Sequence, residues 1–517
     1  MSDMAKEART KEYSLIADDI VAKVRIIDNT ALLIGSYELT VPGMDPATAA
    51  FYDDLKTDLL NKINITPQEH LDIRLAGELK QKFRELSSRM VKERIPHLTD
   101  SQVQFISGSL VQEMLGLGNI EFLLCDNDVE EVCINTSLQP VWVYHKEFGW
   151  LKSNVTMSNE SQIWNYASSI ARRVGRQITI QTPLLDAYLS TGDRVNATIL
   201  PVSSSGNTIT VRKFARKPWT ITDFIANNTI SIEVSAFLWL AMQYEASILM
   251  AGGTAAGKTS LLNVLSSFFP SNQRVVSIEQ TREVTLPSYL QWIPLVVREP
   301  TTEGKGEINM LDLLVNSLRM RPDRIIVGEI RRAEEAQVLF EAIHTGHSVY
   351  ATLHAETISE ALRRLASPPI LLPPVMLESL PLMVTMFRDR RSGIRRVFEV
   401  GEVIPSASDS KPPTIRVLFR WDPATDNMVK VGDSTRIYGM LKTFTSMTDK
   451  DIEDTLRERG EILEWLVWNK INSVEDVGKV FAQYSRDPES VLRTVRKGTL
   501  VRPEEEQAGQ LPFDDAK

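Results

Sequence analysis

The order of hydrophobic and polar positions predicts helices in the first hundred residues. Over residues 46–63, apolar side chains such as Leu55 and Leu59 follow helical spacing. Residues 67–95 form a second, longer amphipathic stretch that is rich in charge. Between residues 21 and 41, short apolar runs favour β-strands instead. We expect residues 1–100 to form a mainly helical N-terminal domain that serves docking or packing.

Residues 101–215 alternate between helical and strand patterns. Val103, Ile106 and Leu110 have helical spacing, and five short runs behind them favour strands. These runs are residues 129–135, 140–145, 176–180, 194–200 and 208–214. A polar loop at residues 201–207 joins the last two. Such a mixture predicts a compact α+β domain.

The rest of the chain divides at two changes of composition. Residues 216–229 place turn formers around a short helical signal, which is typical of a linker. Residues 230–405 alternate strand and helix patterns, which favours an α/β domain with a parallel sheet. A loop rich in proline and serine leads into residues 406–517, where we expect a C-terminal accessory region of strands and then helices.

Composition narrows the class of protein. The chain has 517 residues, of which 43% are hydrophobic and 24% charged, the balance of a soluble globular protein. The net charge of −9 gives no global attraction to nucleic acid, although a local basic groove stays open. The two cysteines favour a reducing compartment and cannot form a four-ligand zinc site. The richest apolar run, residues 371–387, contains Glu378 and prolines, and the first ten residues lack a signal-peptide core. We expect action at a membrane only through partners.

Residues 252–259 carry the clearest chemical signal. They fit the phosphate-loop pattern G-x4-G-K-[ST], with a buried-strand pattern before them and an amphipathic helix pattern after them. Backbone N–H groups of such a loop surround phosphate oxygens, the lysine neutralises phosphate charge, and the hydroxyl binds Mg²⁺. The nucleotide-binding residues we expect are Gly253, Thr254, Ala255, Ala256, Gly257, Lys258, Thr259 and Ser260.

Three later segments place polar residues at strand ends. Residues 274–283 end in a cluster with Glu279 and Glu283, and residues 324–331 carry Glu329 at the position of a Walker B acid. Residues 347–354 are a β-branched run with a histidine at each end. Taken singly, the acids could lie on a solvated face, and the histidines could be ordinary core or surface groups. In this order behind a phosphate loop, they predict a RecA-like ATPase core.

The motifs GGTAAGKTS, IEQTREV, IIVGEIRRAEEA and GHSVYATLH resemble those of the secretion ATPases of type II secretion, type IV pili and archaeal surface filaments. The resemblance is closest to the archaeal branch and covers about residues 100–400. It implies a RecA-like core preceded by a PAS-like α+β domain. It also implies catalytic roles for Glu283 as the acid that positions or activates water, Glu329 near Mg²⁺, and His354 as a γ-phosphate sensor. His347 matches the same motif less closely.

The upstream pieces GDRVNATILP and TITVRKF resemble the second N-terminal domain of that family, and they place Arg194 and Arg212 at its arginine-finger positions. The resemblance implies ATP and Mg²⁺ as cofactors and a homohexamer at the cytoplasmic face of the membrane. Its partner would be a polytopic inner-membrane platform protein, with no direct contact to nucleic acid. The implied activity is ATP hydrolysis that powers protein secretion or assembly of a pilus-like filament.

Two departures from the family pattern keep alternatives open. Gln280 replaces the usual aspartate of the I-E-D motif and cannot carry its charge. The chain also lacks the four-cysteine zinc module of many bacterial relatives. One alternative is an ATPase for conjugation-type DNA transfer. The other is a nucleotide-gated scaffold with weak hydrolysis, for which Gln280 is the motivating residue.

Overall fold

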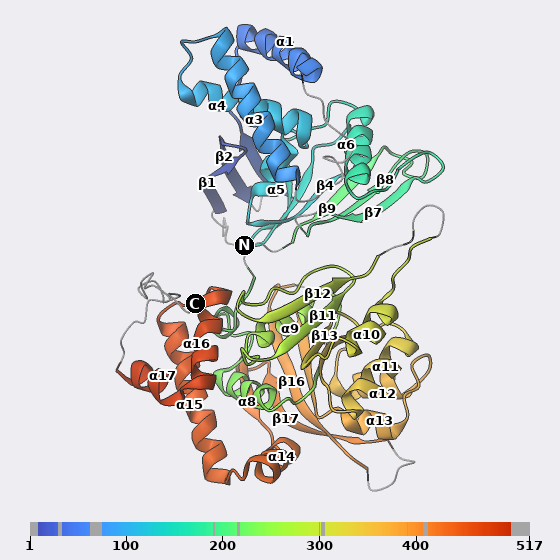
Figure 1. The fold of residues 1–517 in the computed structure, drawn as a ribbon, viewed down its shortest axis with the longest axis vertical. Coiled ribbons are helices and arrows are strands. Elements are labelled where there is room, and N and C mark those ends of the chain that lie inside the picture. Colours follow the sequence, from blue (N-terminus) through green and yellow to red (C-terminus); the bar gives the residue numbers. More distant parts are fainter. Residues whose placement is uncertain are drawn as a thin grey trace, which may run out of the picture. The chain divides into compact units, whose positions relative to one another are not determined.

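The computed structural model describes residues 9–28, 34–62, 75–189, 192–214, 218–298, 300, 305–389, 391–406 and 412–497. The chain divides into two compact units, residues 1–217 and 218–517. Each unit is built around its own nine-stranded sheet (Figure 1). The units are described below one at a time.

The first unit has the strand order β1-β2-β3-β6-β5-β4-β9-β8-β7. Its strands are β1 (Arg9–Ala17), β2 (Ile20–Asp28), β3 (Gly35–Thr40), β4 (Val129–Ile134), β5 (Trp142–His145), β6 (Gly149–Ser153), β7 (Leu184–Tyr188), β8 (Arg194–Thr198) and β9 (Thr208–Arg212). Its helices are α1 (Pro46–Lys62), α3 (Leu75–Arg94), α4 (Asp100–Leu115), α5 (Ile120–Cys125) and α6 (Glu160–Arg173). All neighbours pair antiparallel except β3 and β6, which are parallel.

The N-terminal residues differ from the expectation of a separate helical domain. β1, β2 and β3 form an antiparallel meander, and Gly35 of β3 pairs with Leu151 of β6. Burial alternates along residues 20–26 of β2, so one face of the strand needs helices to cover it. The expected helices α1 and α3 are present (Figure 1). They share an apolar cluster with α4. The stretch between α1 and α3 lies outside the described residues.

One predicted strand does not form. Residues 176–180 do not form a strand in the structure, and β7 follows at Leu184–Tyr188. The N–H of Thr179 donates to the carbonyl of Thr182 at 3.1 Å, and the two hydroxyls lie 2.9 Å apart. This local turn uses backbone groups that a strand would need for a ladder.

The second unit has the strand order β12-β11-β13-β14-β10-β15-β16-β17-β18. Its strands are β10 (Ile248–Gly252), β11 (Arg274–Glu279), β12 (Gln291–Val296), β13 (Arg324–Val327), β14 (Ser348–His354), β15 (Leu382–Arg388), β16 (Arg395–Ile404), β17 (Thr414–Asp422) and β18 (Asn427–Lys430). From β12 to β15 the neighbours are parallel, and from β15 to β18 they are antiparallel.

Helices cover both faces of this sheet. Successive residues of β10 enter different apolar clusters: Ile248 and Met250 join one, and Leu249 and Ala251 join the other. The first cluster includes residues of α7 (Ile221–Ala226), α8 (Ile232–Gln243), α9 (Lys258–Ser266), α14 (Arg436–Thr445), α15 (Asp449–Trp468), α16 (Val474–Arg486) and α17 (Pro488–Arg496). The second includes residues of α10 (Met310–Leu318), α11 (Ala333–His344), α12 (Ile358–Ala366) and α13 (Pro374–Ser379).

Residues 218–229 of the expected linker and the described part of the expected C-terminal region belong to this second unit. Within residues 216–229, α7 is packed into the core with Ile221 fully buried, and the Thr222 hydroxyl donates to the Ile471 carbonyl at 2.8 Å. The strands β17 and β18 extend the main sheet, and α15 lies against α8 (Figure 1). Apolar faces on these elements explain why they join the sheet rather than stand apart. No helix in the described part of the chain is both long and apolar enough to cross a membrane.

Candidate functional site

The phosphate loop connects β10 to α9. Gly257 has φ +97° and caps α9, and Ala255 also has a positive φ of +57°. The left-handed conformation at Gly257 is one that glycine adopts without strain. Helix α9 starts at Lys258, so Thr259 and Ser260 lie in its first turn, where unpaired backbone N–H groups favour an anion. The loop therefore has the backbone shape that its sequence predicts.

Lys258 lies close to the loop and to two acids. Its Nζ donates to the carbonyls of Gly252 and Gly253, both at 3.1 Å. Burial lowers the pKa of Lys258, while the carboxylates of Glu329 and Glu283 act in the opposite direction. The Lys258 ammonium thus bonds to the phosphate loop, and the negative charges of Glu329 and Glu283 favour its protonated form.

Strand register explains how distant motifs meet. Gly252 at the end of β10 pairs with His354 on β14 and with Met386 on β15. The His354 Nε2 and the Thr254 hydroxyl share a hydrogen bond of 2.9 Å. Because the carboxyl ends of parallel strands face one crevice, ligands bind there in open α/β sheets. His347 stands before the amino end of the same strand, so the structure does not bring it to His354.

Glu279 is buried within residues 278–285, which contain the motif IEQTREV and are called the Asp-box segment below. It is 1% exposed, and its Oε1 accepts from the N–H groups of Glu283 and Val284 at 2.8 and 2.9 Å. Burial raises the pKa of Glu279 to about 7. The interpretation that Glu279 lies on a solvated face is therefore wrong. The Glu283 side chain, in contrast, is exposed.

Arg331 connects the Walker B acid to Gln280. Its Nε and Nη2 approach the Glu329 Oε2 at 2.8 and 2.7 Å, and its Nη1 donates to the Gln280 Oε1. Gln280 thus supplies a neutral acceptor to the arginine that holds Glu329. Arg331 was not among the expected site residues, although its place two positions after Glu329 is visible in the sequence.

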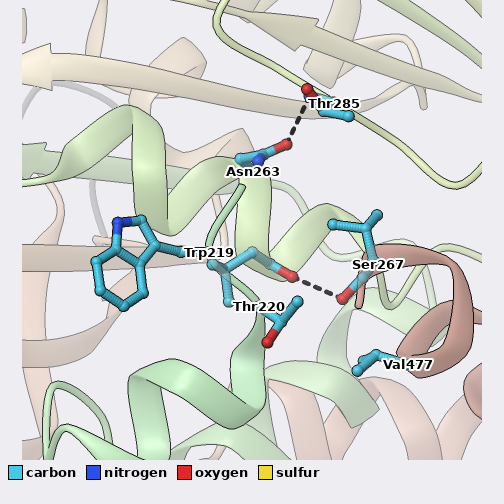
Figure 2. A pocket seen from close by; sticks show the side chains of 8 residues that line it. Trp219, Thr220, Asn263, Ser267, Thr285 and Val477 are labelled. Atoms are coloured by element: carbon cyan, nitrogen blue, oxygen red, sulfur yellow. Dashed lines mark hydrogen bonds between the residues drawn. The ribbon is translucent and has the colours of Figure 1, made fainter. Parts of the chain in front are cut away.

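Two further contacts were also missed from sequence. The Arg395 Nε on β16 donates to the carbonyl of Ala255 in the phosphate loop at 3.2 Å. Asn263 on α9 accepts from the N–H of Thr285 at 2.8 Å, as Figure 2 shows. The cavity beside Asn263 and Thr285 is about 10 Å³, the size of a single water. It has no room for a nucleotide.

Arg194 and Arg212 belong to the first unit. They are a cross-strand pair on β8 and β9, so their side chains share one face of that sheet. Asp186 on β7 accepts from the Arg194 Nε at 3.0 Å and from its Nη2 at 2.6 Å. The two expected arginine fingers are thus brought together with each other, and one of them has a carboxylate partner.

The residues around the phosphate loop fit a nucleoside triphosphate with Mg²⁺. Backbone N–H groups at the start of α9 and the Lys258 ammonium suit phosphate oxygens. The Thr259 hydroxyl and the Glu329 carboxylate are oxygen donors of the kind that Mg²⁺ takes beside phosphates. The site has both a cation and carboxylates, as phosphoryl transfer needs.

Comparison with known proteins gives the family. The family described as type II/IV secretion system protein matches residues 178–378. The uncharacterized protein MJ0900 of Methanocaldococcus jannaschii is 31% identical over 475 residues, which cover 90% of this chain and 83% of that protein. The type IV secretion system protein PtlH of Bordetella pertussis is 31% identical over 264 residues, covering 47% of this chain and 77% of that protein.

Among solved structures, the Legionella pneumophila ATPase DotB is 20% identical in sequence, with a TM-score of 0.39. The match covers 93% of the DotB chain and 72% of this chain. The residues matched by the family, 178–378, include the phosphate loop, Glu283, Glu329 and His354. PtlH is matched over 77% of its own length. The chain therefore belongs to the type II/IV secretion system protein family.

Proposed function

We propose that this protein is a hexameric ATPase motor that acts at the cytoplasmic face of a membrane. It hydrolyses ATP to ADP and phosphate to power protein secretion or the assembly of a pilus-like filament. The observation that carries the proposal is the phosphate loop between β10 and α9, whose Thr254 shares a hydrogen bond with His354 at the carboxyl end of the neighbouring parallel strand, while the charges of Glu283 and Glu329 act on its Lys258. Such a crevice supplies a cradle for phosphate and acids for water and metal.

The roles of the residues follow from their chemistry. Lys258 and the start of α9 bind the phosphates, and Thr259 with Glu329 holds Mg²⁺. The Glu283 side chain is exposed, and its role is to position or activate the attacking water. His354 reports on the γ-phosphate through its hydrogen bond to Thr254 in the loop. The bound Mg²⁺ supplies charge stabilisation for the transferring phosphoryl group.

The remaining positive charge comes from the first unit. Arg194 and Arg212 stabilise the phosphate charge that develops during transfer. A ring supports this assignment, because subunit contacts give an arginine pair on one body access to a nucleotide on another. The moving ring acts on a polytopic membrane protein, through which it associates with the membrane.

Turnover as a function of protein concentration tests the ring. The proposal expects ATP hydrolysis per subunit to rise with concentration, together with growth in mass to six subunits by light scattering. Mixing Lys258→Ala with an Arg194→Ala and Arg212→Ala double variant is expected to restore activity, because each supplies what the other lacks. Full activity in a monomer, or a mixture as inactive as its parts, contradicts the ring. Stimulation by DNA would instead favour the DNA-transfer alternative.

A further inference from the structure

Three consecutive backbone N–H groups of the Asp-box segment donate to side chains. Those of Glu283 and Val284 donate to the Glu279 Oε1 at 2.8 and 2.9 Å. The next one, of Thr285, donates to the Asn263 Oδ1 at 2.8 Å, the contact marked in Figure 2. A loop usually leaves such groups to water, so this segment is held by side chains instead.

Burial makes these bonds hard to replace. Glu279 is 1% exposed and Asn263 is 9% exposed, while the Val284 side chain is fully buried in the core. Water therefore has little access to the acceptors, and the loss of either side chain leaves a backbone donor without its partner. The Val284 side chain fixes the middle of the segment, and the two acceptors fix its backbone.

Asn263 connects this segment to the phosphate loop. It lies on α9, five residues after Lys258, which is the first residue of that helix. A helix moves as a stiff unit, so a shift of its first turn carries Asn263 with it. Through Thr285, that shift reaches the backbone next to Glu283. No sequence motif marks Asn263.

We propose that Asn263 and Glu279 are positioning residues that fix Glu283 relative to the phosphate-binding helix. Phosphate bound at the start of α9 thereby sets the place of the acid that acts on water. This inference rests on the proposed ATPase function, and it adds the route by which nucleotide binding reaches Glu283. Positioning of this kind affects the rate of the chemical step more than the binding of substrate.

The test uses three variants of the full chain. Asn263→Leu removes the acceptor at similar volume, and Asn263→Asp keeps an acceptor oxygen at the same place. Ser267→Ala is the matched control, because Ser267 lines the same small cavity but its hydroxyl donates only to the carbonyl of Val264 on its own helix. Each variant is assayed for ATP turnover, for affinity for a fluorescent ATP analogue, and for amide hydrogen exchange over residues 283–285.

The proposal expects kcat of Asn263→Leu to fall about tenfold or more, with nucleotide affinity within about twofold. Exchange over residues 283–285 becomes faster in that variant. Asn263→Asp recovers most of the rate, and Ser267→Ala matches the wild type in all three assays. Unchanged exchange in Asn263→Leu, or faster exchange with an unchanged kcat, overturns the proposal. If the wild type itself fails to hydrolyse ATP, the proposed function fails and the positioning role falls with it, even though exchange still reports the contact.

Discussion

The His354 Nε2 on β14 and the Thr254 hydroxyl in the phosphate loop lie 2.9 Å apart and share a hydrogen bond. The two residues are separated by a hundred positions in sequence, and the pairing of Gly252 with His354 in the parallel sheet brings them together. The bond ties a strand end to the loop that would hold phosphate. It gives the histidine a direct way to respond to a bound nucleotide.

Thr254→Val should weaken turnover because valine keeps the shape of threonine but removes the hydroxyl. A hydrogen bond contributes on the order of 1 kcal/mol, so we expect kcat to fall about fivefold to tenfold. Thr254→Ser keeps the hydroxyl and serves as the control. A double-mutant cycle with His354→Ala is the measurement, because coupled residues give losses that do not add. Additive losses would mean that the bond has no part in catalysis.

Gln280 is expected to work through Arg331 rather than as a charge. Gln280→Glu keeps an acceptor for the arginine, so we predict turnover within about threefold of wild type. Gln280→Leu removes the acceptor and frees Arg331 and Glu329 to reorient, so we predict about a tenfold lower kcat. Steady-state kinetics with titrated Mg²⁺ measures both effects. Normal turnover in Gln280→Leu would show that this contact is dispensable.

The buried carboxyl of Glu279 makes stability depend on pH. Its pKa is raised from 4.5 to about 7, so between these values the folded chain holds a proton that the unfolded chain has released. The free energy of unfolding therefore falls as the pH rises through that window, by at most on the order of 3 kcal/mol. Glu279→Gln cannot titrate, and its urea midpoint should lack this slope. Parallel pH profiles for the two proteins would contradict the assignment.

Variants of Arg194 and of its partner Asp186 distinguish an effect on stability from an effect on activity. Its partner Asp186 and Arg194 itself are each 43% exposed, and such surface pairs contribute about 1 kcal/mol or less. We predict that Asp186→Asn leaves the unfolding midpoint nearly unchanged and kcat within about threefold. Arg194→Ala should lower kcat at least about a hundredfold, because an arginine that stabilises phosphate charge acts only in the transition state. Equal losses in both variants would make Arg194 a structural ion-pair residue.

Much of the second unit could be predicted from sequence because its signals are local. The phosphate-loop pattern includes its own strand and helix, and β11, β13 and β14 begin or end within a residue of the predicted runs. The hydrogen bond between Thr254 and His354 agrees with the rule that parallel strands present their carboxyl ends to one crevice.

What sequence reasoning missed depends on pairing between distant segments. The partner of β3 is β6, which lies more than a hundred residues later, and no local pattern specifies that parallel register. Asn263 carries no motif, and its contact with Thr285 appears only when α9 packs against the Asp-box segment. Glu279 and Glu283 look alike in sequence, yet one is buried and the other exposed, because burial is decided by packing.

The central claim is that this site hydrolyses ATP with Glu283 as the acid that acts on water. ATP hydrolysis by wild type and Glu283→Gln at saturating ATP tests it most directly, with binding of a fluorescent ATP analogue measured alongside. We predict turnover in the wild type and a loss of at least about a hundredfold in the variant, with similar affinity for nucleotide. Equal turnover in the two proteins, or binding without hydrolysis in the wild type, would contradict the account.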